Sequence, residues 1–76
     1  MKPSDKQLVN LIVEITGKEA KHITDAAHLR NDLSMDSISL ADLLASLEED
    51  YELVIEVEDV SEIETVGQLK SYVKNL

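Results

Sequence analysis

The sequence of 76 residues contains no cysteine, tryptophan or phenylalanine, and only two glycines and one proline. Without cysteine, neither a disulfide framework nor a thiolate metal site is available to reinforce the fold. We find no secretory signal and no membrane-spanning run, so we expect a cytoplasmic protein. A chain of this length predicts a single domain, residues 1–76, which buries only about 60% of the surface that its unfolded form exposes.

Basic residues are also scarce, and none lies between Arg30 and Lys70. That stretch holds twelve of the chain's 16 acids, namely Asp32, Asp36, Asp42, Glu48, Glu49, Asp50, Glu52, Glu56, Glu58, Asp59, Glu62 and Glu64. A field of this sign repels nucleic acids and anionic membranes, so neither is an expected partner, and it attracts proteins with basic patches. Acidity also keeps small domains soluble, so composition alone names no function.

Hydrophobic periodicity predicts an all-α fold, a small bundle of three main helices and one short helix. The first helix begins at a capping box formed by Ser4 and Gln7, and Gly17 stops it. Residues 18–35 have poor periodicity and predict a long loop, with at most a turn of helix, that is pinned to the core by isolated apolar side chains.

The second helix is the clearest, with Asp36 as its N-cap and an end near Asp50. Residues 51–57 are rich in β-branched side chains, but no second strand exists to pair with them, so we expect an extended connector. A short helical turn is predicted over 59–64. A second capping box at 65–68 starts the last helix, whose predicted apolar face is Val66, Leu69, Tyr72, Val73 and Leu76.

Groups that could support catalysis or bind a metal are few. Ser37 lacks the Gly-x-Ser-x-Gly setting of a hydrolase nucleophile, and His22 and His28 lie in the predicted loop without the spacing of a metal motif. The acidic stretch contains no Asp-x-Asp-x-Asp-Gly calcium loop. We therefore expect neither an enzyme nor a metal centre.

Asp36 and Ser37 taken alone are ordinary helix-start residues. Their surroundings are more specific, because Arg-Asn-Asp-Leu-Ser-Met-Asp-Ser-Ile at 30–38 resembles the Asp-Leu-Gly-x-Asp-Ser-Leu signature of acyl carrier proteins. The resemblance covers essentially the whole chain. It continues through the helix 41–51 and then through Ile55, Ile63, Thr65-Val66 and Tyr72-Val73.

The resemblance implies that Ser37 carries covalent 4′-phosphopantetheine and that Asp36 helps a phosphopantetheinyl transferase to position magnesium and coenzyme A. The arm would hold acyl intermediates as thioesters and present them to enzymes of fatty-acid, lipid or polyketide-type synthesis. We expect a monomer. Matched positions nominate Asp42, Glu48, Glu49, Ile55 and Val57 for recognition of partners with basic patches. Core positions that could also line an acyl pocket are Leu40, Leu44, Leu47 and Ile63.

Several positions depart from the common pattern. Ser34 stands where glycine is usual, so the left-handed backbone conformation is less accessible there. Leu40 fills a position often held by threonine or serine, which we expect to narrow an acyl cavity. Other departures are Ile38, Ser39, Ala41 and Ala45. They fit a carrier in a dedicated pathway as well as, or better than, one with a housekeeping role in fatty-acid synthesis. A carrier of aminoacyl groups and an acidic interaction module without a cofactor stay open as alternatives.

Overall fold

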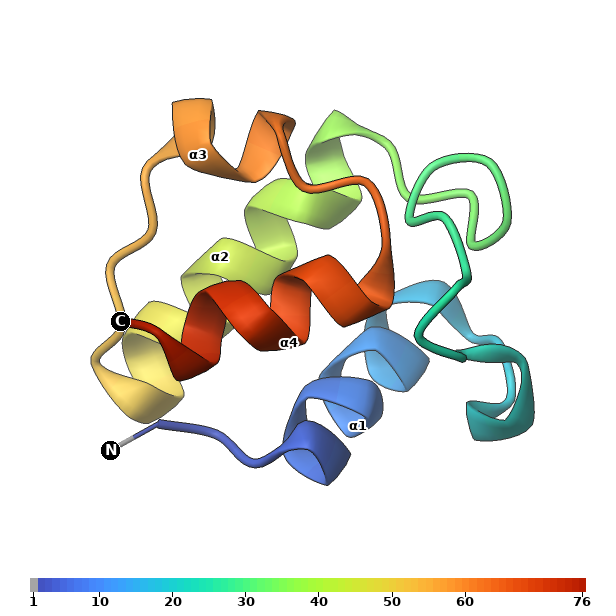
Figure 1. The fold of residues 1–76 in the computed structure, drawn as a ribbon, viewed down its shortest axis with the longest axis horizontal. Coiled ribbons are helices and arrows are strands. Elements are labelled where there is room, and N and C mark those ends of the chain that lie inside the picture. Colours follow the sequence, from blue (N-terminus) through green and yellow to red (C-terminus); the bar gives the residue numbers. More distant parts are fainter. Residues whose placement is uncertain (1) are drawn as a thin grey trace.

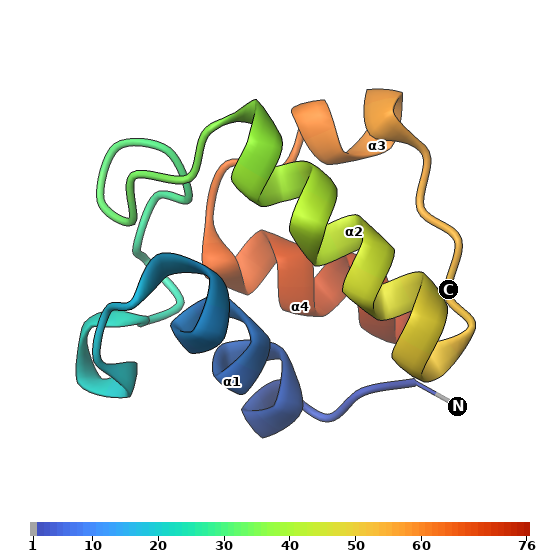
Figure 2. The same ribbon diagram turned by 180° about the vertical axis from the view of Figure 1, so that it is seen from behind.

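The computed structural model describes residues 2–76, which form four α-helices and one turn of 3-10 helix. The elements are α1 (Asp5–Thr16), η1 (Ala20–His22), α2 (Ser37–Tyr51), α3 (Val57–Ser61) and α4 (Val66–Lys74). Helices α1, α2 and α4 form the body of the bundle, and α3 lies beside the first half of α2 (Figures 1 and 2). Apart from one isolated bridge, residues 2–76 contain no β-structure, which confirms the all-α prediction.

Both predicted capping boxes are present. The Ser4 hydroxyl accepts from the backbone N–H of Gln7 at 3.2 Å, and the Gln7 side chain accepts from the backbone N–H of Ser4 at 2.8 Å. Thr65 and Gln68 repeat the arrangement at α4. Helix α1 ends at Thr16 and is capped by Gly17, whose φ of 73° is a left-handed conformation that glycine adopts without strain. Local sequence signals therefore set these helix ends, as predicted.

The long loop between α1 and α2 is held against the start of α4. Three backbone hydrogen bonds of 2.9–3.1 Å join them: Leu29 N to Glu64 O, Val66 N to Ala27 O, and Gly67 N to Asp25 O. A Cβ at position 67 would lie 3.1 Å from the Asp25 carbonyl oxygen, so glycine permits this close approach. The loop also buries five apolar side chains, namely Ile23, Ala27, Leu29, Leu33 and Met35. It is therefore a structural part of the fold, as predicted.

The prediction for the short helix was wrong in its bounds. Helix α3 spans Val57–Ser61, and the backbone N–H of Val60 donates to Glu56 O at 3.1 Å. Val60 is buried against the core, while Val57 is 70% exposed. Val60 is the one buried residue among the five of this helix, and a single buried residue gives no periodic pattern. The start of the helix at Val57 could therefore not be predicted from the sequence.

Some predicted core residues lie elsewhere. Leu44 and Ile63 are only half-buried and pack against the core from its edge. Leu76 lies beyond the end of α4 and is 46% exposed, so it does not belong to that helix's apolar face. Conversely, Ile55 in the connector is buried at 7% exposure. The connector thus contributes a core residue instead of a surface contact.

Candidate functional site

Ser37 is the first residue of α2, and its hydroxyl is exposed. Asp36 precedes it in an extended conformation and accepts a 2.8 Å hydrogen bond from the backbone N–H of Ser39. The Ser37 side chain makes no hydrogen bond to the described residues 2–76. The helix therefore presents a free hydroxyl at its positive end, where a modifying enzyme can reach it and where an anion is stabilised.

The carboxylate of Asp36 is ionised over the neutral range. The hydrogen bond from the Ser39 backbone N–H lowers the pKa of Asp36 below its ordinary value. Since the side chain is exposed, this anion can also meet a cation from solvent. Beside the Ser37 hydroxyl, Asp36 thus combines a helix cap with a fixed negative charge.

The turn before α2 is closed by one backbone hydrogen bond, from Met35 N to Leu29 O at 2.9 Å. Leu29 and Leu33 are each 1% exposed and fix the turn to the core. Within it, Ser34 adopts a φ of 57°, a left-handed conformation that disfavours residues with a Cβ. The turn thus explains why glycine suits this position of the signature, and why serine there is strained.

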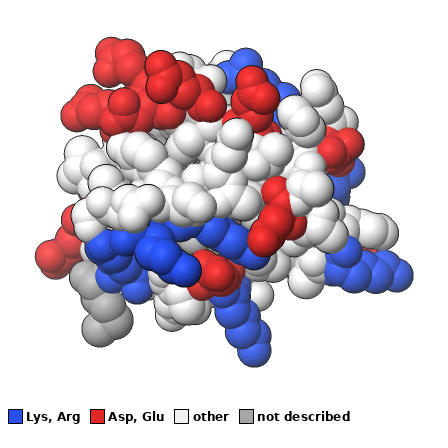
Figure 3. All heavy atoms as spheres, viewed as in Figure 1, with Lys and Arg blue, Asp and Glu red and all other residues white. Residues whose placement is uncertain are grey.

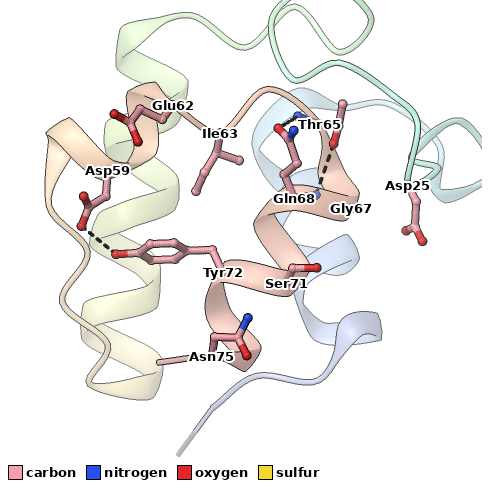
Figure 4. Close-up of a pocket in the computed structure, with 10 residues that line it drawn as sticks. All are labelled: Asp25, Asp59, Glu62, Ile63, Thr65, Gly67, Gln68, Ser71, Tyr72 and Asn75. Atoms are coloured by element: carbon pink, nitrogen blue, oxygen red, sulfur yellow. Dashed lines mark hydrogen bonds between the residues drawn. The ribbon is translucent and has the colours of Figure 1, made fainter.

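A small cavity of about 100 Å³ lies between α2 and α3, and Ser37 is one of its lining residues. Its lining is mainly apolar and consists of Arg30, Ser37, Leu40, Ala41, Leu44, Val57, Val60 and Ser61. Of the predicted pocket residues, Leu40 and Leu44 are in this lining. Leu47 is fully buried in the core, and Ile63 lies toward α4 (Figure 4). Val57, predicted only for partner contact, also lines the cavity, and Val60 and Arg30 line it without having been predicted there.

Acidic side chains form much of the exposed surface around α2 and α3. Asp42, Glu48 and Glu49, which the sequence nominated for partner recognition, are exposed on α2. Figure 3 shows acids gathered at the α3 end of one face, with basic side chains along the opposite edge. Val57 is exposed, whereas the buried Ile55 offers no contact surface, so its nomination was wrong. Ile38 and Val54 are also exposed apolar side chains, at 72% and 67%.

A larger open groove of about 690 Å³ lies between α3 and α4 (Figure 4). Its lining is mostly polar, and Tyr72 donates a hydrogen bond to Asp59 across it. Ser37 does not line this groove. Residues 2–76 bring together no group of three His, Cys, Asp or Glu side chains that could hold a metal ion. No helix in this range is long and apolar enough to cross a bilayer.

Comparison with known proteins decides the family. The model of a family described as a phosphopantetheine attachment site matches residues 6–73. The chain belongs to this family. Its fold is also similar to that of a candidate acyl carrier protein from Mycobacterium tuberculosis, with a TM-score of 0.84 and 28% sequence identity over 93% of this chain and 95% of that one. The protein is therefore a carrier with covalent 4′-phosphopantetheine, not an enzyme, as predicted.

The residues of the carrier fit such an arm. A free, exposed hydroxyl stands at the N-terminus of a helix of 15 residues, where the helix dipole favours a phosphodiester. Ser37 also lines the apolar cavity between α2 and α3. When bound, the arm supplies a thiol that holds acyl groups as thioesters. The chain itself contributes the attachment point and the adjoining apolar wall.

Proposed function

We propose that Ser37 is the residue that bears the 4′-phosphopantetheine arm, and that the carrier presents acyl thioesters to partner enzymes in a dedicated pathway of fatty-acid, lipid or polyketide-type synthesis. The observation that supports this assignment is the free Ser37 hydroxyl in the first turn of α2, beside the cavity. On attachment, Ser37 Oγ loses its proton and bonds to the phosphorus next to the pantetheine, the pyrophosphate bond of coenzyme A breaks, and adenosine 3′,5′-bisphosphate leaves, so that Ser37 bears the arm as a phosphodiester. Asp36 supports this step by helping the transferase to position magnesium.

The partners of the carrier are a phosphopantetheinyl transferase and enzymes that process acyl chains. We assign their recognition to Asp42, Glu48 and Glu49 on α2, together with the exposed Val57 on α3. Acids of this kind attract partners with basic patches and accelerate encounter in a salt-dependent way. The carrier acts as a cytoplasmic monomer of one domain.

The volume of the cavity limits the length of acyl chain that the domain can shelter. At about 100 Å³ it is smaller than a 150 Å³ cavity that accepts benzene, so it shelters only a short acyl segment in this conformation. Leu40 is buried and lines this cavity, which supports the prediction that it limits the space for an acyl chain. A longer chain requires α2 and α3 to separate or stays outside the domain.

Intact mass spectrometry tests the attachment site. The wild-type protein is incubated with coenzyme A and a phosphopantetheinyl transferase, beside Ser37→Ala and the control Ser39→Ala. We expect the mass of one arm on the wild type and on Ser39→Ala, and none on Ser37→Ala. No gain on the wild type, or an equal gain on Ser37→Ala, contradicts the proposal.

A further inference from the structure

Arg30 is the only Lys or Arg side chain between Lys21 and Lys70 in the sequence. It is exposed, and it forms no hydrogen bond or ion pair with the described residues 2–76 through its side chain. It lines the α2–α3 cavity together with Ser37. A single free guanidinium therefore stands beside the candidate attachment point, inside an otherwise acidic half of the protein.

The position of Arg30 is set by its neighbours. Leu29 is buried, its N–H donates to Glu64 O, and its carbonyl oxygen accepts from Met35 N, each at 2.9 Å. The last of these bonds closes the turn that leads into Asp36 and α2. Arg30 thus extends from an anchored backbone, so only its side chain has to be ordered when it binds a ligand.

None of the described acidic side chains near Arg30 forms an ion pair with its guanidinium, which is therefore free to bind an anion. The carboxylate of Asp32 accepts a 2.8 Å hydrogen bond from the backbone N–H of His28. Glu64 lines a neighbouring hollow with Arg30, but it forms no ion pair with it within 4.0 Å. Asp36 caps α2 through Ser39. Each nearby acid raises the local negative potential, and none of them pairs with the guanidinium.

A phosphodiester on Ser37 would add another anion to this acidic surface, next to the carboxylate of Asp36. A guanidinium offers several N–H donors in a planar fork that matches two phosphate oxygens. We propose that Arg30 binds the phosphodiester of the arm on Ser37 and holds the start of the arm at the mouth of the α2–α3 cavity. This inference rests on the proposed attachment at Ser37 and adds a positioning residue to it.

A cycle of apo and holo proteins tests the inference. Wild type, Arg30→Gln and Arg30→Lys are each prepared in both forms, with Lys21→Gln as the control, because Lys21 has the same charge, is exposed and lies outside the cavity. The readouts are the holo-minus-apo difference in Tm and the side-chain Nε–Hε signal of Arg30 in ¹H–¹⁵N NMR spectra. Comparing differences removes any effect of the substitution on the apo protein.

We expect the Arg30 Nε–Hε signal to shift on attachment, and the holo-minus-apo Tm difference to fall by about 1–4 °C in Arg30→Gln. Arg30→Lys retains part of that difference, and Lys21→Gln retains all of it. A mass gain on Ser37 with equal differences in wild type and Arg30→Gln overturns the inference about Arg30 alone. If Ser37 gains no mass, both this inference and the proposed attachment site are overturned.

Discussion

The Tyr72 hydroxyl on α4 donates a 2.8 Å hydrogen bond to the carboxylate of Asp59 on α3 (Figure 4). Helix α3 has five residues, which is too short for a helix to be stable on its own in water. Its attachment to the bundle therefore depends on the burial of Val60 and on this bond. Because Val57 and Val60 form one wall of the cavity beside Ser37, the Asp59–Tyr72 bond also supports that wall.

Tyr72→Phe should loosen α3 without unfolding the bundle, since it removes the bond and keeps the ring. We expect faster hydrogen exchange at the amides of Val60 and Ile63, which close the turns of α3, with little change in α1. The exchange of the α1 amides in the same variant is the internal control. Unchanged exchange in Tyr72→Phe would show that Val60 alone holds the helix.

The same hydrogen bond can be detected through its effect on the pKa of Tyr72. The hydrogen bond to Asp59 raises the pKa of Tyr72 above its ordinary value. The stabilisation of the fold by this hydrogen bond is therefore fully present below about pH 10, the pKa of tyrosine in the unfolded chain. It is lost as the pH rises through the higher pKa of Tyr72 in the folded protein. In a Tyr51→Phe background, ultraviolet titration of the phenol should show a lower Tyr72 pKa after Asp59→Asn. An unchanged titration would contradict this cause.

Replacing Ser34 by glycine should stabilise the protein. Ser34 has a φ of 57°, where an L-residue is strained and glycine is not. This relief of strain is partly offset, because glycine loses more backbone freedom on folding than serine does. We therefore expect a net increase of up to about 1 kcal/mol in the free energy of unfolding. Ser71→Gly in the exposed part of α4 is the control and should lose up to about 0.5 kcal/mol. Urea denaturation measures both, and a loss of stability in Ser34→Gly would refute the strain.

Asp36→Asn separates the charge of Asp36 from its role as a cap. Asparagine caps helices about as well as aspartate, so we expect α2 to persist at neutral pH, while attachment of the arm slows because the carboxylate is gone. The pKa of Asp36 is lowered, so the stability from its charge is present above the unfolded pKa of about 4 and is lost as pH falls through the lower folded value. Wild type should therefore lose more stability in acid than Asp36→Asn. Circular dichroism and the rate of mass gain provide the two measurements.

Salt should raise the Tm of the carrier. Twelve acids lie between Arg30 and Lys70 without an intervening base, and many of them are exposed on the surface. Their repulsion destabilises the compact state and is screened by salt or by divalent cations. The double substitution Glu48→Gln and Glu49→Gln should weaken this salt dependence. A Tm that does not change with salt concentration would argue against repulsion.

Local signals allowed the starts of α1, α2 and α4 and the candidate attachment residue to be predicted from the sequence. Ser4 and Gln7 define a capping box within four residues, and Asp36 and Ser37 belong to one continuous signature. The signature has glycine at position 34, so the sequence predicted that Ser34 has less access to the left-handed conformation, and the structure shows that Ser34 adopts it nevertheless, with a φ of 57°. Each of these features depends on neighbours along the chain, which a sequence displays directly.

Tertiary packing decided the features that the sequence did not predict. Ile55 lies in a stretch with β-like alternation, so nothing in its pattern showed that it would face the core. The cavity wall combines Arg30 from the loop, Leu40 from α2 and Val60 from α3. Their proximity depends on how three separate segments pack together, and no local pattern encodes it.

The bonds between the long loop and α4 also have a consequence for the order of events during synthesis. The turn before Ser37 is hydrogen-bonded to Glu64 through Leu29. Val66 and Gly67 form hydrogen bonds with Ala27 and Asp25, which precede that turn. A nascent chain therefore exposes Ser37 well before the segment that orders its surroundings has been made. Attachment that requires this geometry would have to wait for the last helix, so a truncated chain would escape loading although it contains the serine.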